Sequence, residues 1–154
     1  MLTENELIKF RRELHSYPET GWCEFVTTHK IVEKLRSFGL DPIYGRQVIN
    51  PEFVAGRNPA KVEEAKKAAL DKGVPPEFIE SMQDYTGVAA IFETGRPGPV
   101  LAIRFDMDCV DVDEAHEAGH RPFDEGWAST NPGHMHSCGH DGHTTMGIAV
   151  CNWI

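Results

Sequence analysis

A ten-residue stretch of this sequence contains most of the side chains that could bind a metal ion. Residues 134–143 read HMHSCGHDGH, which gives four histidines, one cysteine and one aspartate. In an extended segment His136, Cys138 and His140 would face the same side, because side chains alternate with a period of two. A thiolate and an imidazole are ligands that suit zinc and other first-row metals. The spacing therefore predicts a metal site that contains Cys138 and His140.

The residues around this motif predict how it is held. Gly139 and Gly142 would let the backbone bend close to an ion. Asp141 is expected to begin a helix, where the helix dipole favours a carboxylate. His143 lies one turn further into that helix, too far along to share the extended arrangement of Cys138.

Two further acids follow an apolar run. Residues 100–108 read VLAIRFDMD, and up to Arg104 the residues that would face either side of a strand are all apolar. This pattern predicts a strand buried on both faces. Asp106 and Asp108 lie at its carboxyl end, where open α/β sheets bind their ligands. Taken alone, such a pair of acids is more typical of a solvated strand end.

Other elements must position these residues. Thr3 and Glu6 form a capping box that predicts a helix over 3–15, and a second amphipathic helix is expected from about 24 to 38. Residues 45–84 are expected to be an insertion that carries a short surface helix. The run TGVAAIFE and the run over 100–108 predict two strands joined by a turn. Helices, then strands, then a final helix predict an α/β layered domain.

The composition is that of one ordinary globular domain and argues against several classes of function. The 154 residues carry 15 Lys and Arg against 24 Asp and Glu, a net charge of −9. This charge argues against a nucleic-acid partner, because phosphate binding needs a basic face. No apolar run approaches the roughly 18 residues of a membrane span, and the first residues lack the apolar core of a secretory signal. We therefore expect a cytoplasmic protein with no membrane partner and with reduced cysteines.

Two other interpretations of the motif remain open at this point. A structural zinc site usually closes four ligands arranged in two separated pairs, and no second Cys/His pair with that spacing occurs in the sequence. An unliganded histidine-rich loop is the other interpretation. Either would make the chain a non-catalytic metal-binding or interaction fragment rather than an enzyme.

The motif and the acidic run together resemble a known enzyme family. HMHSCGHDGHTT after VLAIRFDMD is similar to the amidohydrolase branch of the M20 metallopeptidases, and the similarity covers most of residues 10–40 and 85–150. The resemblance implies a three-layer α/β/α catalytic domain and a centre of two divalent ions, usually manganese or zinc. It implies that Cys138 and His140 are metal ligands and that Asp108 supports the metal site. Asp106 stands where more distant relatives carry a liganding histidine, and it is not counted among the expected ligands.

The resemblance also implies parts of an enzyme that this sequence does not show. In the family the general base is a glutamate of a Glu-Glu pair that follows the motif, and further ligands and a lid-like dimerisation domain come later still. The one Glu-Glu pair here, Glu63–Glu64, precedes the motif. We therefore expect residues 1–154 to be the amino-terminal part of a zinc-peptidase-like catalytic domain, truncated, with helices on a mixed sheet and the lid absent.

The expected function follows from the same resemblance. The substrate class is a small-molecule amide, cleaved at the bond to glutamate, as in aminobenzoyl-glutamate, or to another N-acyl amino acid. Members of the family dimerise, and a homologous second subunit is one expected partner. Without the general base, the chain alone is expected to be inactive.

Overall fold

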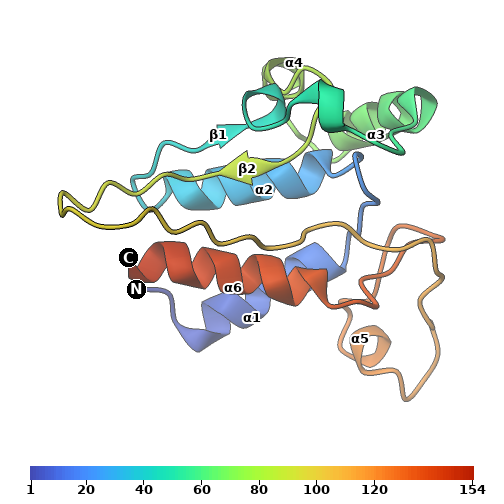
Figure 1. The fold of residues 1–154 in the computed structure, drawn as a ribbon. Coiled ribbons are helices and arrows are strands. Elements are labelled where there is room, and N and C mark those ends of the chain that lie inside the picture. The colour runs from blue at the N-terminus through green and yellow to red at the C-terminus, as the bar shows by residue number, and fades with distance from the viewer.

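Two of the six helices, one from each end of the chain, run side by side in the computed structural model, which describes all residues 1–154 (Figure 1). These are α1 (Glu4–His15) and α6 (His140–Trp153). Near the ends of the chain, the Leu2 amide donates to the Asn152 side-chain oxygen at 2.5 Å. Phe10 and Leu14 of α1 pack in one apolar cluster with Ile148 of α6. The helix that carries the motif is therefore fixed along the first helix.

The starts of the first two helices follow from local hydrogen bonds. Thr3 and Glu6 form the predicted capping box at the start of α1. Helix α2 (Phe25–Arg36) lies in the middle of the molecule (Figure 1) and contacts both α3 (Pro59–Asp71) and α6. Its first free amides, those of Val26 and Thr27, donate to the carboxylate of Glu19. Both predicted helices are confirmed, although the second ends at Arg36 rather than near residue 38.

The region 45–84, in which one short surface helix was predicted, is mostly helical. It contains two short 3-10 turns (Gly45–Gln47 and Pro51–Phe53), α3 (Pro59–Asp71) and α4 (Pro76–Ser81). Val62 and Ala69 of α3 are fully buried in the larger apolar cluster, which also contains residues of α2 and α4. The insertion thus packs against α2 through one apolar stripe.

The sheet is much smaller than predicted. It consists of β1 (Ile43–Tyr44) and β2 (Val88–Ala89), which pair antiparallel with Ile43 opposite Ala89. The predicted run TGVAAIFE forms a strand only at Val88–Ala89. Helices packed with a small sheet agree with the expected α/β class at this coarse level.

The prediction of a buried strand over 100–108 is wrong. This segment is extended but belongs to no strand, and Val100 and Leu101 are 99% and 81% exposed. The physical reason is that a strand buried on both faces needs neighbouring strands, and the strands of this chain pair only with each other. The end of the segment is held instead, since Phe105 lies against Gly147 of α6.

The remaining elements connect these parts. The connection from 109 to 139 contains α5 (Arg121–Asp124) and two isolated bridges, Thr20 with Cys109 and Val110 with Met135. All four cysteines are free thiols. None of the helices has the length and apolar character needed to cross a membrane.

Candidate metal centre

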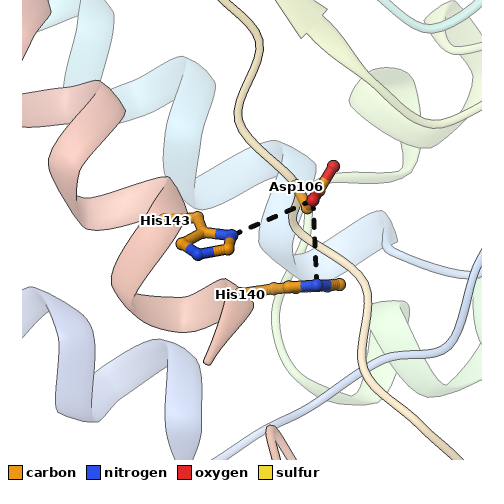
Figure 2. Close-up of side chains that lie close together, drawn as sticks. All are labelled: Asp106, His140 and His143. Atoms are coloured by element: carbon orange, nitrogen blue, oxygen red, sulfur yellow. Dashed lines mark ion pairs between the residues drawn. The ribbon is translucent and has the colours of Figure 1, made fainter. Parts of the chain in front are cut away.

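The start of α6 places two histidines of the motif next to each other. His140 is the first residue of the helix and His143 follows three residues later, so both lie on one helix face. Their imidazole rings stack with centroids 5.3 Å apart (Figure 2). Gly139, just before the helix, has a φ of 79°, a left-handed conformation that residues with a side chain rarely adopt.

Asp106 completes a cluster of three potential ligands. One oxygen of its carboxylate, Oδ2, lies 3.7 Å from Nε2 of His140 and 3.9 Å from Nδ1 of His143 (Figure 2). One ligand atom from each of the three residues lies within 4.8 Å of the others. Ligands bound about 2.1 Å from a shared ion lie roughly 3–4 Å apart, so this cluster is close to the size that one ion requires.

The two oxygens of Asp106 have different partners. Its Oδ1 atom is buried and forms an ion pair with the exposed Arg104, so Oδ2 is the oxygen that faces the two histidines. Oxygen and imidazole nitrogen donors together suit zinc, manganese and similar divalent ions.

Asp108 orients His140. The Nδ1 atom of His140 lies 2.9 Å from the backbone oxygen of Asp108 and 3.0 Å from its Oδ1 atom. Both partners are acceptors when the carboxylate is ionised, so Nδ1 carries the proton and the lone pair of the neutral ring is on Nε2, the atom that faces Asp106. Metal-bound histidines typically donate their second ring N–H to a carboxylate or a carbonyl in this way.

Cys138 lies outside the cluster. Its side chain is exposed, and no group of three potential ligands in the chain includes it. The expectation that His136, Cys138 and His140 face one side is wrong, because residues 137–138 form a turn and the alternation stops there. His136 is 4% exposed, and neither of its ring nitrogens has a hydrogen-bond partner. Burial lowers the pKa of His136 to about 4, so the ring is neutral at pH 7.

Two members of the cluster, Asp106 and His143, were not among the ligands expected from the sequence. The spacing of three between His140 and His143 is the signal for their neighbourhood, since such residues share a helix face. No signal of this kind exists for Asp106, which reaches the helix only through the fold.

A second group of charged side chains lies next to the first turn of α6 and is largely buried. Asp141 accepts from Nδ1 of His15 at 2.9 Å and from Nε of Arg11 at 3.1 Å. The other ring nitrogen of His15 lies 3.0 Å from the carboxylate of Glu114, which also contacts His120. Burial opposes the charge on His15, but its hydrogen bonds to Asp141 and Glu114 outweigh burial and raise the pKa of His15.

Comparison with known proteins identifies relatives over nearly the whole chain. Residues 102–154 match Peptidase family M20/M25/M40. The chain is 46% identical to a Haemophilus influenzae homolog of one p-aminobenzoyl-glutamate hydrolase subunit, over 97% of this chain and 36% of that protein. It is 41% identical to the indole-3-acetyl-aspartic acid hydrolase of Enterobacter agglomerans, over 96% of this chain and 34% of that protein.

Two solved structures share the fold. One is an aminobenzoyl-glutamate utilization protein from Klebsiella pneumoniae, with a TM-score of 0.70 and 28% identity over 96% of this chain and 31% of that chain. The other is a Bacillus subtilis protein described as a dinuclear metal binding peptidase from the M20 family, with a TM-score of 0.62 and 27% identity over 97% of this chain and 30% of that one. The chain spans about a third of the length of the relatives it matches. Residues 102–154 therefore match the M20 family, and nearly the whole chain is similar to proteins named as hydrolases and to a structure described as an M20 peptidase.

Proposed function

We propose that this chain supplies part of the metal centre of a metal-dependent amidohydrolase. The observation that carries the proposal is the orientation of His140, whose Nδ1–H donates to Asp108 while Nε2 faces Asp106. This arrangement presents one lone pair to an ion and holds the ring in place. The proposed substrate is an amide of glutamate, because a relative at 46% identity is named for p-aminobenzoyl-glutamate hydrolase.

The chain offers two overlapping sets of ligands. Cys138 and His140 are the ligands that the family motif implies. Asp106 and His143 are favoured by the geometry, since both lie within reach of an ion held by His140. A bound divalent ion would supply a Lewis acid that polarises the amide carbonyl and lowers the pKa of water. The complete centre would hold two ions, in line with the dinuclear centre named for the Bacillus subtilis structure, and the proposed metals are zinc or manganese.

The general base for the reaction is the part that this chain does not provide. Glu63 and Glu64 lie exposed on α3, in the insertion, and Glu63 pairs with Lys66 at 2.8 Å. The cluster of Asp106, His140 and His143 contains no glutamate. We therefore propose that the chain alone does not hydrolyse amides, and that the base and further ligands belong to a polypeptide segment outside these residues or to a partner protein.

A chimera tests the proposed function. The 154 residues would be joined to the part of the Haemophilus influenzae relative that follows the matched region, and aminobenzoyl-glutamate would be supplied with Mn²⁺ or Zn²⁺. We expect hydrolysis by the chimera and none by the chain alone. Cys138→Ser and His140→Gln should remove the activity of the chimera, whereas Cys151→Ser should not. A folded chimera that hydrolyses no aminobenzoyl-glutamate with either metal would contradict the substrate assignment.

A second substrate class is favoured by a specific relative. The indole-3-acetyl-aspartic acid hydrolase is 41% identical to this chain, so indole-3-acetyl-aspartate belongs in the same assay. The non-catalytic alternative has a different signature: the purified monomeric chain would hold about one ion firmly, and the ion would be lost in Cys138→Ser. Weak, exchangeable metal binding is what an incomplete catalytic centre predicts.

A further inference from the structure

One histidine joins three distant parts of the chain behind the metal centre. His15 is at the end of α1, is 4% exposed, and uses both ring nitrogens. Nδ1 lies 2.9 Å from Oδ2 of Asp141 in the first turn of α6, and Nε2 lies 3.0 Å from Oε1 of Glu114 in the connection from 109 to 139. Since both partners are carboxylates, both ring nitrogens donate and His15 is an imidazolium between two anions.

The contact of His15 with Asp141 and Glu114 holds the start of α6, which lacks a capping side chain. The helix begins after Gly139 and has no side-chain cap at its N-terminus. Asp141 is 1% exposed and is the residue directly after His140. A contact that fixes the Asp141 side chain therefore fixes the turn that presents His140. The other end of the contact is also anchored, because Glu114 accepts from the Ser129 amide at 2.5 Å and contacts His120 at 2.8 Å.

Such a group is poorly explained by stability alone. Removing charges from water is unfavourable, and buried ion pairs often contribute no more to stability than well-packed apolar side chains would. Their better-attested use is to select one geometry. Here the geometry selected is the position of the first turn of α6 relative to α1 and to the connection.

We infer that His15 is a positioning residue for the metal centre: by holding Asp141 and Glu114 together, it keeps His140 against Asp108. The inference rests on the proposed function, because it treats His140 as a metal ligand. It also makes a claim about the metal-free chain, namely that His15 sets which ring nitrogen of His140 carries the proton.

Two variants break the contact at different points. His15→Gln removes the imidazolium, and Glu114→Gln keeps the shape of the distant partner while removing its charge. Neither residue belongs to the cluster of potential metal ligands. His29→Gln is the matched histidine control, a half-buried residue on α2 that packs on Phe78. Glu19→Gln is the matched control for a buried carboxylate, because the Glu19 side chain accepts hydrogen bonds only from Val26 and Thr27 in the first turn of α2.

Two measurements on the 154-residue chain test the inference. Titration with Co²⁺ alone, followed by its visible absorption, gives the affinity and reports the ligand geometry. Long-range ¹H–¹⁵N NMR of the metal-free chain gives the tautomer of His140. We expect His15→Gln and Glu114→Gln to weaken Co²⁺ binding about tenfold, as for other groups that orient ligands, to change the Co²⁺ spectrum, and to shift His140 away from the pure Nδ1–H form. Both controls should stay within twofold of the original affinity.

The Co²⁺ titration and the His140 tautomer together distinguish a failure of the metal proposal from a failure of the positioning role. If the chain binds no Co²⁺ but the His140 tautomer still responds to His15→Gln, the metal proposal fails and the positioning role stands. If folded His15→Gln and Glu114→Gln both keep the original tautomer and the original Co²⁺ affinity, the positioning role is wrong. Should His15→Gln unfold the chain, the isosteric Glu114→Gln decides by the same two measurements.

Discussion

The position of one proton on His140 depends on a neighbouring residue that does not itself belong to the ligand cluster. Nδ1 of His140 has two acceptors on Asp108, the backbone oxygen and the carboxylate. Asp108→Ala removes only the second, so the orientation of the ring should weaken without being lost. We expect the chain to bind Zn²⁺ about tenfold more weakly, at the low end of the range for such supporting groups.

Competition with a coloured zinc chelator measures this change. Asp111→Ala is the control, because Asp111 is an exposed acid nearby that contacts Lys61 and His134 instead. An equal loss of Zn²⁺ affinity in both variants would mean that only local negative charge matters, and that the hydrogen bond to His140 does not.

A second residue, Glu24, sets a pH dependence of stability. Burial, together with the nearby charges of Glu19 and Asp108, raises the pKa of Glu24 from 4.5 to about 7, although Thr86 donates a hydrogen bond to it. The folded chain therefore binds an extra proton between about pH 4.5 and pH 7, and this contribution to the free energy of unfolding is lost as the pH rises through that window.

Glu24→Gln should remove this dependence. The amide keeps an acceptor for Thr86 but cannot ionise, so the stability relative to the original chain should rise on the order of 3 kcal/mol between pH 4.5 and pH 8. Urea unfolding at several pH values gives the difference, with the exposed Glu93→Gln as control. A difference that stays flat with pH would show that folding does not raise the pKa of Glu24.

At the scale of elements, the contact between α6 and the extended segment before it depends on one missing side chain. A Cβ atom at Gly147 would lie 2.7 Å from the ring of Phe105, whereas one at Gly142 would meet only Nε of Arg11 at 3.8 Å. Gly147→Ala would therefore displace Phe105, the neighbour of Asp106. We expect it to destabilise the fold by about 1–3 kcal/mol, as other overpacked sites do.

Gly142→Ala on the same helix supplies the control for Gly147→Ala. Alanine is favoured over glycine within a helix by about 0.5–1 kcal/mol, so this variant should melt at the same temperature or higher. Thermal unfolding followed by circular dichroism compares the two. Equal melting temperatures would mean that Phe105 does not pack on α6 in solution.

At the scale of the whole molecule, the extended segment exposes a row of apolar side chains. Val100, Leu101 and Ile103 are all exposed, and the backbone beside them pairs with no strand. An unpaired extended segment of this kind is a template for pairing with another chain. We expect the protein to self-associate as its concentration rises, and Leu101→Lys to reduce that association.

Ile8→Lys makes the same change of charge at an exposed position on α1. It therefore distinguishes an effect of net charge on association from an effect of the extended segment itself. Light scattering over a concentration series measures the mean mass of the particles in solution. If both lysine variants reduce that mass equally, net charge and not the extended segment controls association.

The sequence predicted best what depends on neighbours along the chain. The capping box of Thr3 and Glu6 needs only residues three apart, and it is present. The strand over 100–108 needed partners from elsewhere, and the apolar pattern alone could not show that none would pair with it. Likewise, alternation placed His136, Cys138 and His140 on one side only for an extended segment, and the chain turns at 137–138, just before Gly139.

The candidate site likewise combines residues that the local sequence identifies with residues that only folding brings close. His140 was identified from the motif, and its Nδ1 atom contacts Asp108, the residue for which the family resemblance predicts a supporting role. Asp106 joins the histidines only because Phe105 packs on α6 and Thr144 donates to the backbone oxygen of Asp106 at 2.9 Å. Contacts of this kind are properties of the folded chain and leave no trace in residue spacing.

The hydrogen bond between Leu2 and Asn152 has a practical consequence for observing this molecule. Because the first and last residues lie side by side (Figure 1), a donor dye at one end and an acceptor dye at the other would transfer energy efficiently while α6 is docked. Release of α6 from α1 would separate the dyes. Detachment of α6 can thus be followed as a loss of energy transfer, one molecule at a time, without changing any residue of the candidate site.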